Sequence, residues 1–312
     1  MDLVAWALTT GEAGMRSQAR GLAQAVSSHV VEKVVERRPV WPWVGALIDC
    51  GLEPPWPDLI ISCGRRAAGL ALAVGKASQG KTFTVHVQDP RWRASAFDLV
   101  VAMGHDRIDE GPNILKATTA LHDITPSALA DAANAWRDRF ARLGRPLIGV
   151  VLGGDLKGRA FTGADGERLL AGLRRIRNST GAGVAITPSR RTPISVREMV
   201  ERAFRDDGRA YLWDLQGDNP YRAILALSDQ LIVTSDSVSM VSEALASPHP
   251  VEVFDLGFPR HRGFIQSLVD RNWVRRFDGE ATPIQDRQPI NATFDIARVV
   301  SERLQARTGR SG

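Results

Sequence analysis

One short stretch, residues 230–246, limits the folds open to this chain of 312 residues. It starts with an apolar run, Leu231 to Val233, which is typical of a buried strand. Thr, Ser and Asp follow at 234–237, and these residue types favour turns and helix amino ends. A helix pattern continues to the prolines of 247–250, and a second strand-like run starts at Val251. This β–turn–α–β order predicts a parallel sheet whose turn offers N–H groups and a helix dipole to an anion.

The same order of elements recurs along the chain. Apolar runs at 3–8, 59–63 and 147–152 are each followed by small or charged residues and then by a helical pattern. We therefore expect an α/β fold with two doubly wound parallel-sheet domains. The break at Gly144-Arg145-Pro146 predicts a first domain of residues 1–144 and a second of 145–312. Helices are also predicted at 194–204 and 264–272, and the last predicted element is a helix at about 293–306.

Composition excludes several classes of function. A net charge of +5 fits small anions, an acidic membrane face or weak nucleic-acid contact, and chooses none of them. No nucleic-acid-reading motif is present, and 6% aromatic residues argues against base-stacking platforms, so we expect no nucleic-acid partner. Two cysteines without a CxxC pair and six unclustered histidines predict neither a zinc site nor a disulfide framework. We expect a cytoplasmic protein without a membrane-spanning segment.

A segment rich in proline and tryptophan, residues 38–57, bears on whether the protein contacts a membrane. Trp41, Trp43 and Trp56 either touch a membrane surface, which would make the protein peripheral to a membrane, or pack the segment onto its own domain. We favour packing.

Two glycine-containing loops could approach a phosphate. Gly11 and Gly14 follow the first strand with the spacing Gly-x-x-Gly, which differs from the dinucleotide pattern Gly-x-Gly-x-x-Gly and argues against an NAD site. Gly153 and Gly154 follow the strand at 147–152 and could expose N–H groups to a phosphate.

Several polar residues are predicted to meet at one sheet edge. Ser189, Arg190 and Ser237 each follow a predicted strand of the second half, as do the two glycines. Because carboxyl ends of parallel strands lie at the same edge, these residues can converge on one ligand. Glu243 lies in the helix after the turn, where it is either a ligand contact or a solvated residue.

Three residues are candidate catalytic bases because each follows a predicted strand end. They are Asp89, His105 and His122. Each also fits a plain role as a cap or a satisfied polar residue, so the catalytic residue stays unknown at this stage.

A set of motifs together resembles one family, the mitochondrial-fission ELM family, named for the plant "elongated mitochondria" protein and with many bacterial relatives. The motifs follow one another from residue 11 to about 265 and cover most of the chain. They are Gly11–Gln18, Pro57–Arg66, Asp89–Arg91, Ala120–Pro126, Val151–Gly154, Ser189–Pro193, Asn219–Tyr221 and Val233–Ala244.

The stretch 230–246 is also similar to the donor site of GT-B glycosyltransferases. This resemblance implies two Rossmann-like domains facing across a cleft, with the terminal helix returning to the first domain. It implies that Glu243 accepts hydrogen bonds from a ribose and that the diphosphate lies at 237–239. The implied donor-binding set is Gly153, Gly154, Ser189, Arg190, Asp236, Ser237, Val238, Ser239 and Glu243. The implied acceptor and diphosphate loop contains Gly11, Gly14, Arg16 and Gln18.

The resemblance implies a function in the same terms. A nucleotide-sugar, of which a UDP-sugar is the first candidate, would bind between the domains, and its sugar would pass to an envelope or lipid-linked acceptor. No Asp-x-Asp triplet is present, and helix dipoles and arginines can neutralise a diphosphate, so we expect neither a metal nor a further cofactor.

Two other functions stay open. Arg16 follows the first loop where the glycosyltransferase that acts on the peptidoglycan lipid precursor has a glycine-rich loop with a catalytic histidine. This departure favours a non-catalytic adaptor that recruits a dynamin-like partner, as family analogy suggests. The second alternative is a nucleoside-diphosphate-sugar epimerase.

Overall fold

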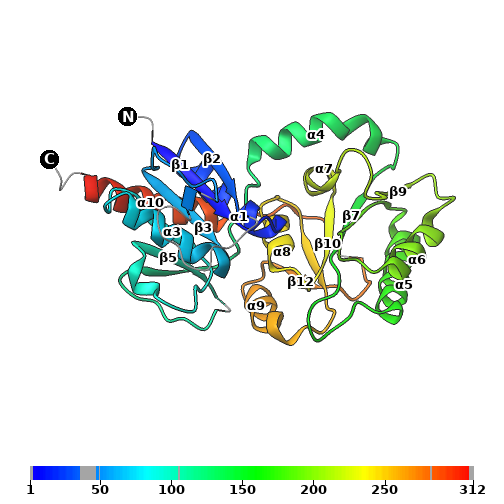
Figure 1. Cartoon of the computed structure of the whole chain (residues 1–312). Helices are drawn as coiled ribbons and strands as arrows, with labels where there is room; N and C mark the ends of the chain where they lie inside the picture. Colours follow the sequence, from blue (N-terminus) through cyan, green and yellow to red (C-terminus); the bar gives the residue numbers. More distant parts are fainter. Residues whose placement is uncertain (1–2, 36–46, 49, 105, 282, 309–312) are drawn as a thin grey trace. The chain divides into compact units, whose positions relative to one another are not determined.

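The computed structural model describes residues 3–308 except 36–46, 49, 105 and 282. The described chain forms two compact units, each an α/β unit built on a six-stranded parallel sheet. The first unit contains the residues up to Asp123 and those from Asn291 onward, and the second contains Ile124–Ile290 (Figure 1). The sequence predicted a division at 144, whereas the compact units divide after Asp123.

The first sheet has the order β2-β1-β3-β4-β5-β6. Neighbouring strands pair in parallel, with Trp6 of β1 opposite Val31 and Ile60. The strands are β1 (Val4–Thr9), β2 (His29–Val34), β3 (Leu59–Cys63), β4 (Phe83–Val87), β5 (Leu99–Met103) and β6 (Ile114–Ala117). Order 2-1-3 places a topological switch point between β1 and β3, where open α/β sheets bind ligands.

The helices of the first unit are α1 (Ala13–Val26), α3 (Arg65–Ala77) and α10 (Ala292–Thr308), with a 3-10 turn η1 at Ala94–Ala96. Helix α3 is rich in alanine and buries Ala67, Ala71 and Val74 against alternate sheet residues such as Leu8 and Ile60. Helix α1 packs on α10, so the last helix of the chain belongs to the first unit.

The second sheet has the order β12-β11-β10-β7-β8-β9. Its strands are β7 (Leu147–Leu152), β8 (Gly183–Pro188), β9 (Ala210–Leu212), β10 (Gln230–Thr234), β11 (Val251–Phe254) and β12 (Arg275–Arg276). Counted from β7, this is the dinucleotide-fold order 3-2-1-4-5-6, whose switch point lies between β7 and β10. The central strands β7 and β10 are buried throughout because helices cover both faces of the sheet.

The helices of the second unit divide between the two faces of its sheet. Helices α5 (Gly163–Thr180) and α6 (Ile194–Phe204) pack on one set of alternate strand residues, which includes Ile148 and Ile232. Helices α4 (Pro126–Ala141), α7 (Tyr221–Leu227), α8 (Val238–Leu245) and α9 (Pro259–Asp270) cover the opposite set, which includes Leu231 and Val233.

The structure differs from the sequence prediction at three elements. The predicted loop at 11–18 is helical from Ala13, with the amides of Met15 and Arg16 bonded to the Glu12 carbonyl. Helix α9 starts at Pro259, five residues before the predicted start, because proline is suited to the first helical position. Strand β12 was not predicted because two residues carry no periodicity.

Of the three tryptophans considered for membrane contact, Trp41 and Trp43 lie outside the described residues. Trp56 packs on its own unit, with its ring 6.1 Å from that of Trp6.

Candidate functional site

The candidate site lies at the carboxyl edge of the second sheet, around the switch point between β7 and β10. Gly153 and Gly154 follow β7, and Ser189 follows the neighbouring β8. Residues 235–237 follow β10 and lead into α8. The register pairs Val151 with Val233, so the ends of the two strands lie side by side, as the sequence predicted.

The carboxylate of Asp236 joins the three loops at this edge. Its side chain is fully buried, and Oδ2 accepts a hydrogen bond of 2.8 Å from the Gly154 amide and one of 3.0 Å from Arg191. Oδ1 accepts a hydrogen bond of 2.6 Å from the Thr234 hydroxyl. Thr234 in turn accepts one of 2.7 Å from the Gly153 amide. Asp236 therefore positions the loops, with both oxygens engaged inside the protein.

The two glycines are required for this close packing. A Cβ on Gly153 would lie 2.0 Å from Oδ1 of Asp236, and a Cβ on Gly154 would lie 2.0 Å from the Arg191 carbonyl oxygen. The sequence predicted that this loop exposes N–H groups to a phosphate. That exposure is not found, because both amides donate to Thr234 and Asp236.

At this edge, the first amides of α8 have no hydrogen-bond partner among the described residues. Ser237 is the N-cap, and its hydroxyl accepts a hydrogen bond of 3.3 Å from the Met240 amide. Val238 and Ser239 occupy the first two helical positions, whose N–H groups have no partner within a helix, and both residues are partly exposed. The helix dipole adds positive potential at the same point.

Two adjacent arginines at this edge have different surroundings. Arg191 is tied to Asp236 and donates a further hydrogen bond of 3.1 Å to the Asp155 carbonyl oxygen. Arg190 is exposed, and within the described part of the chain its side chain has no hydrogen bond or ion pair. The Ser189 hydroxyl accepts a hydrogen bond of 3.2 Å from the Arg191 amide and so shapes this loop. Arg190 is thus the arginine available to an anion.

Glu243 is a buried residue and not a solvated one. Only 8% of its surface is exposed, and the hydroxyl of Tyr221 donates a hydrogen bond to its Oε2 atom. Tyr221 was not proposed as a site residue from the sequence. It belongs to the Asn219-Pro220-Tyr221 motif that supported the family resemblance, and that motif was the available signal.

His261 is a second residue that the sequence did not indicate, because the helix that carries it was expected to start later. Its Nδ1 lies 3.1 Å from the carbonyl oxygen of Ser235, which can only accept, so Nδ1 carries the proton. Burial lowers the pKa of His261, while the hydrogen bond to Ser235 acts in the opposite direction. This histidine supports the turn from the α9 side.

The corresponding edge of the first unit contains the other predicted loop. Gly11 has a φ of +98°, and its amide lies 3.3 Å from the Thr9 hydroxyl to which it donates. Arg16 forms an ion pair of 2.9 Å with Glu32 of β2. Gln18 is buried within α1, and its Nε2 donates a hydrogen bond of 3.0 Å to the Gly14 carbonyl oxygen. The amino end of α1 has no side-chain cap.

The candidate bases occupy different surroundings. Asp89 follows β4 and is buried, with an ion pair of 3.1 Å to Arg91 and a hydrogen bond of 2.8 Å from the Arg91 amide. His122 is 1% exposed, and its amide donates a hydrogen bond of 3.0 Å to Thr293. His105 lies outside the described residues. Asp89 is thus bonded to Arg91 through its side chain, and His122 is bonded to Thr293 through its backbone amide.

Among the residues that the structure describes, no group of three or more His, Cys, Asp or Glu side chains is arranged to hold a metal ion. Nor does any described helix have the length and apolar character needed to cross a membrane.

Comparison with known proteins identifies the family. The family model for mitochondrial fission ELM1 matches residues 13–304. The chain belongs to this family. It is 30% identical over 282 residues to the mitochondrial fission protein ELM1 of Arabidopsis thaliana, which covers 82% of this chain. The chain spans 66% of the length of that relative.

Solved structures support the fold. A UDP-N-acetylglucosamine 2-epimerase is similar with a TM-score of 0.57 at 14% identity, covering 99% of this chain and 96% of that one. The enzyme of the same name from Neisseria meningitidis, bound to UDP-GlcNAc, has a TM-score of 0.54 at 10% identity, with 97% and 99% covered. MurG of Acinetobacter baumannii has a TM-score of 0.51 at 10% identity, with 97% and 92% covered. The ELM chain therefore has the GT-B fold.

Proposed function

We propose that this ELM-family protein binds a nucleotide-sugar at the carboxyl edge of its second sheet. The observation that carries the proposal is the amino end of α8 at the switch point between β7 and β10. The amides of Val238 and Ser239 are the donors available to a diphosphate there. Arg190 supplies a positive charge without a competing carboxylate among the described residues.

Glu243 is the proposed ribose partner. Its carboxylate lies on the helix that starts at the proposed diphosphate site, and carboxylate oxygens accept hydrogen bonds from hydroxyl groups such as those of a ribose. Tyr221 would hold the carboxylate in one orientation. In this proposal Asp236, Gly153 and Gly154 shape the site without touching the diphosphate.

The first candidate ligand is a UDP-sugar, because the Neisseria meningitidis enzyme of similar fold was solved with UDP-GlcNAc bound. Helix dipoles, amides and Arg190 can neutralise a leaving diphosphate without a metal. The proposed reaction is transfer of the sugar to an envelope or lipid-linked acceptor.

The test of binding is calorimetric titration with UDP-, GDP- and ADP-sugars. We expect one of them to bind one molecule per chain, and Glu243→Gln to weaken binding tenfold or more. Glu201→Gln, an exposed glutamate of α6, is the matched control and should bind as the wild type does. Absence of binding by all three, or equal affinity in the Glu243 variant, would refute the assignment.

The reaction class is tested on the same samples. Release of free nucleoside diphosphate in the presence of a membrane-lipid extract supports transfer. Conversion of the sugar to its epimer with the nucleotide still attached would favour the epimerase instead.

A second candidate function is a protein-binding adaptor. Two observations favour it: the family match to a mitochondrial fission protein, and the pairing of Arg16 with Glu32 where an active acceptor loop was expected. A stoichiometric complex with a dynamin-like GTPase that survives Glu243→Gln, in a chain that binds no nucleotide-sugar, would decide for the adaptor.

A further inference from the structure

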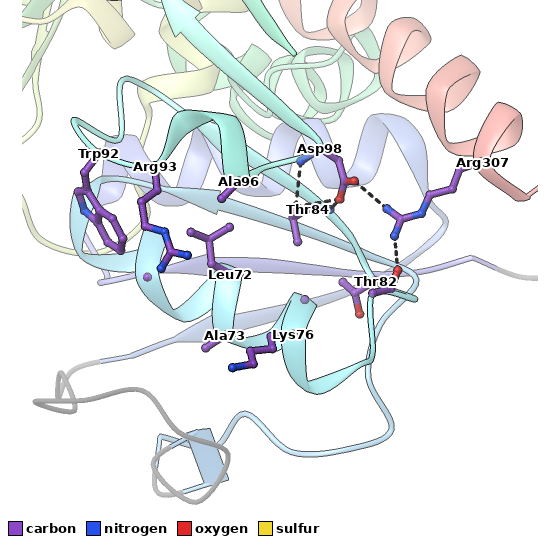
Figure 2. A pocket seen from close by; sticks show the side chains of 13 residues that line it. Leu72, Ala73, Lys76, Thr82, Thr84, Trp92, Arg93, Ala96, Asp98 and Arg307 are labelled. Atoms are coloured by element: carbon purple, nitrogen blue, oxygen red, sulfur yellow. Dashed lines mark hydrogen bonds and ion pairs between the residues drawn. The ribbon is translucent and has the colours of Figure 1, made fainter. Parts of the chain in front are cut away.

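A groove of about 690 Å³ lies on the first unit, between α3 and the chain that joins β4 to β5. Its floor includes Leu72 and Ala73 of α3, and one wall is the chain from Trp92 to Ala96. Figure 2 shows Trp92 and Arg93 at one end and Arg307, from α10, at the other. The volume is within the range of about 300–1,000 Å³ that is usual for small-molecule sites.

The segment 88–93, which leads into this wall, has an unusual backbone conformation. Gln88, Arg91 and Arg93 have φ values of +78°, +68° and +51°, although none of them is glycine. Such conformations cost free energy and persist where surrounding contacts hold them, often at ligand sites. Here Asp89 holds Arg91 through its amide and its guanidinium, and the Gln88 amide donates to Val101 with a length of 2.8 Å.

This backbone path places the indole of Trp92 against α3. A Cβ on Gly69 would lie 3.6 Å from the ring, so a residue without a side chain leaves room beneath it. The residue remains 43% exposed. An exposed indole over small residues offers a flat apolar surface on which an organic group can lie.

More positive than negative side chains line the groove. Asp98 is the one acid among the lining residues, and Arg307 already neutralises it with an ion pair of 2.9 Å. The remaining charged side chains, Lys76 and Arg93, have no ion pair within the described part of the chain. The groove therefore has an excess of positive charge above an apolar floor.

We propose that this groove binds a soluble, single-chain amphiphilic anion, with a carboxylate or phosphate on an aliphatic or aromatic body. The body lies over Leu72 and Ala73 against the Trp92 indole. The anionic group contacts Arg93 and Lys76. The site is separate from the proposed nucleotide-sugar site and does not depend on it.

The test is calorimetric titration of the full chain with decanoate below its micelle concentration, with inorganic phosphate and 1-decanol as probes of the two halves of the ligand. We expect decanoate to saturate at one molecule per chain and the other two to bind at least tenfold more weakly. Lys76→Gln with Arg93→Asn should weaken decanoate binding tenfold or more, since asparagine tolerates the left-handed backbone at 93.

Two variants complete the test. Ala96→Trp fills the groove from an exposed position without changing a charge and should abolish binding with the circular dichroism spectrum unchanged. Arg142→Asn, an exposed arginine of the second unit, should bind as the wild type does. Absence of decanoate binding, or equal binding by the double variant, would overturn the proposal. If the protein does not bind decanoate but sediments with phosphatidylglycerol vesicles in a way that depends on Trp92, the proposal is overturned, and the groove would instead contact a membrane surface.

Discussion

The carboxyl edges of the two sheets are built from similar topology but use their polar residues differently. In the second unit, a fully buried aspartate gathers the loops after β7, β8 and β10. In the first unit, the charges that join α1 to β2, Arg16 and Glu32, are more exposed. The comparison teaches that glycine and aspartate motifs at such an edge can serve to pack the loops. The groups left over, here the amino end of α8 and Arg190, are then the ones available to a ligand.

The largest effect is expected from Gly153→Ala in the second unit. The added methyl group would meet Asp236 at 2.0 Å and displace a buried carboxylate from its donors. We expect a loss of about 4 kcal/mol in the free energy of unfolding, measured with urea. Gly208→Ala is the control, because nothing lies within 4 Å of the added atom. A loss below about 1 kcal/mol would show that the loop is not packed in this way.

Acid should weaken the first unit through His86. This residue is buried in β4, its Nδ1 lies 2.8 Å from the Ser62 hydroxyl, and burial lowers its pKa from 6.5 to about 4. As the pH falls below 6.5, the unfolded state takes up the proton first, so stability present above pH 6.5 is lost progressively down to about pH 4. At 1.36 kcal/mol per pKa unit, this loss is about 3 kcal/mol.

The measurement is urea unfolding at several pH values between 7 and 4, for the wild type and for His86→Gln. The variant has no titrating group at this position, so its stability should depend less on pH across the same range. Parallel curves for the two proteins would mean that His86 does not carry the effect.

The two neighbouring arginines should separate stability from binding. Arg191→Ala removes a donor from the buried Asp236 and should cost about 1–3 kcal/mol of unfolding free energy. Arg190→Ala should leave unfolding within about 0.5 kcal/mol of the wild type but reduce nucleotide-sugar affinity severalfold. If both changes affected stability equally and affinity equally, Arg191 could not be assigned to stability and Arg190 to binding.

The smallest effect is expected at the edge of the first unit. Glu32 joins Arg16 and Arg20, and all three side chains are between 30% and 44% exposed. Glu32→Gln should therefore change the free energy of unfolding by less than about 1 kcal/mol, and high salt should reduce the difference further. A loss as large as that from Gly153→Ala would contradict the contrast between the two edges.

Much of the fold could be predicted because its signals are local. The strand at 147–152 and the helix at 194–204 have the predicted bounds, since an apolar run and a 3.6-residue period mark them. Thr125 caps α4 by accepting from the Ala128 amide, and Pro126 starts the helix, as that residue pair indicates. The order of the strands in each sheet and the packing of α4 on α7 depend on contacts between residues far apart in the sequence. Sequence periodicity contains no information about such contacts.

The meeting of the loops that form the candidate site was predictable, but the contacts of each residue were less so. Residues after β7, β8 and β10 do come together, because parallel strands end at one edge. The sequence could not reveal that Asp236 accepts a hydrogen bond from the Gly154 amide. Nor could it reveal that Tyr221 donates one to Glu243, 22 residues away. Both contacts depend on how loops and helices pack. The motif containing Tyr221 could be recognised in the sequence, but its hydrogen bond to Glu243 could not be predicted.

Amide hydrogen exchange, read residue by residue at saturating UDP-GlcNAc, tests the central claim most directly. If the diphosphate lies on the amino end of α8, exchange should slow at Val238 and Ser239. It should stay unchanged at Gly153 and Gly154, whose amides are already bonded within the protein. Slowing at the two glycines without a change at Val238 and Ser239, or no slowing anywhere in the second unit, would contradict the account.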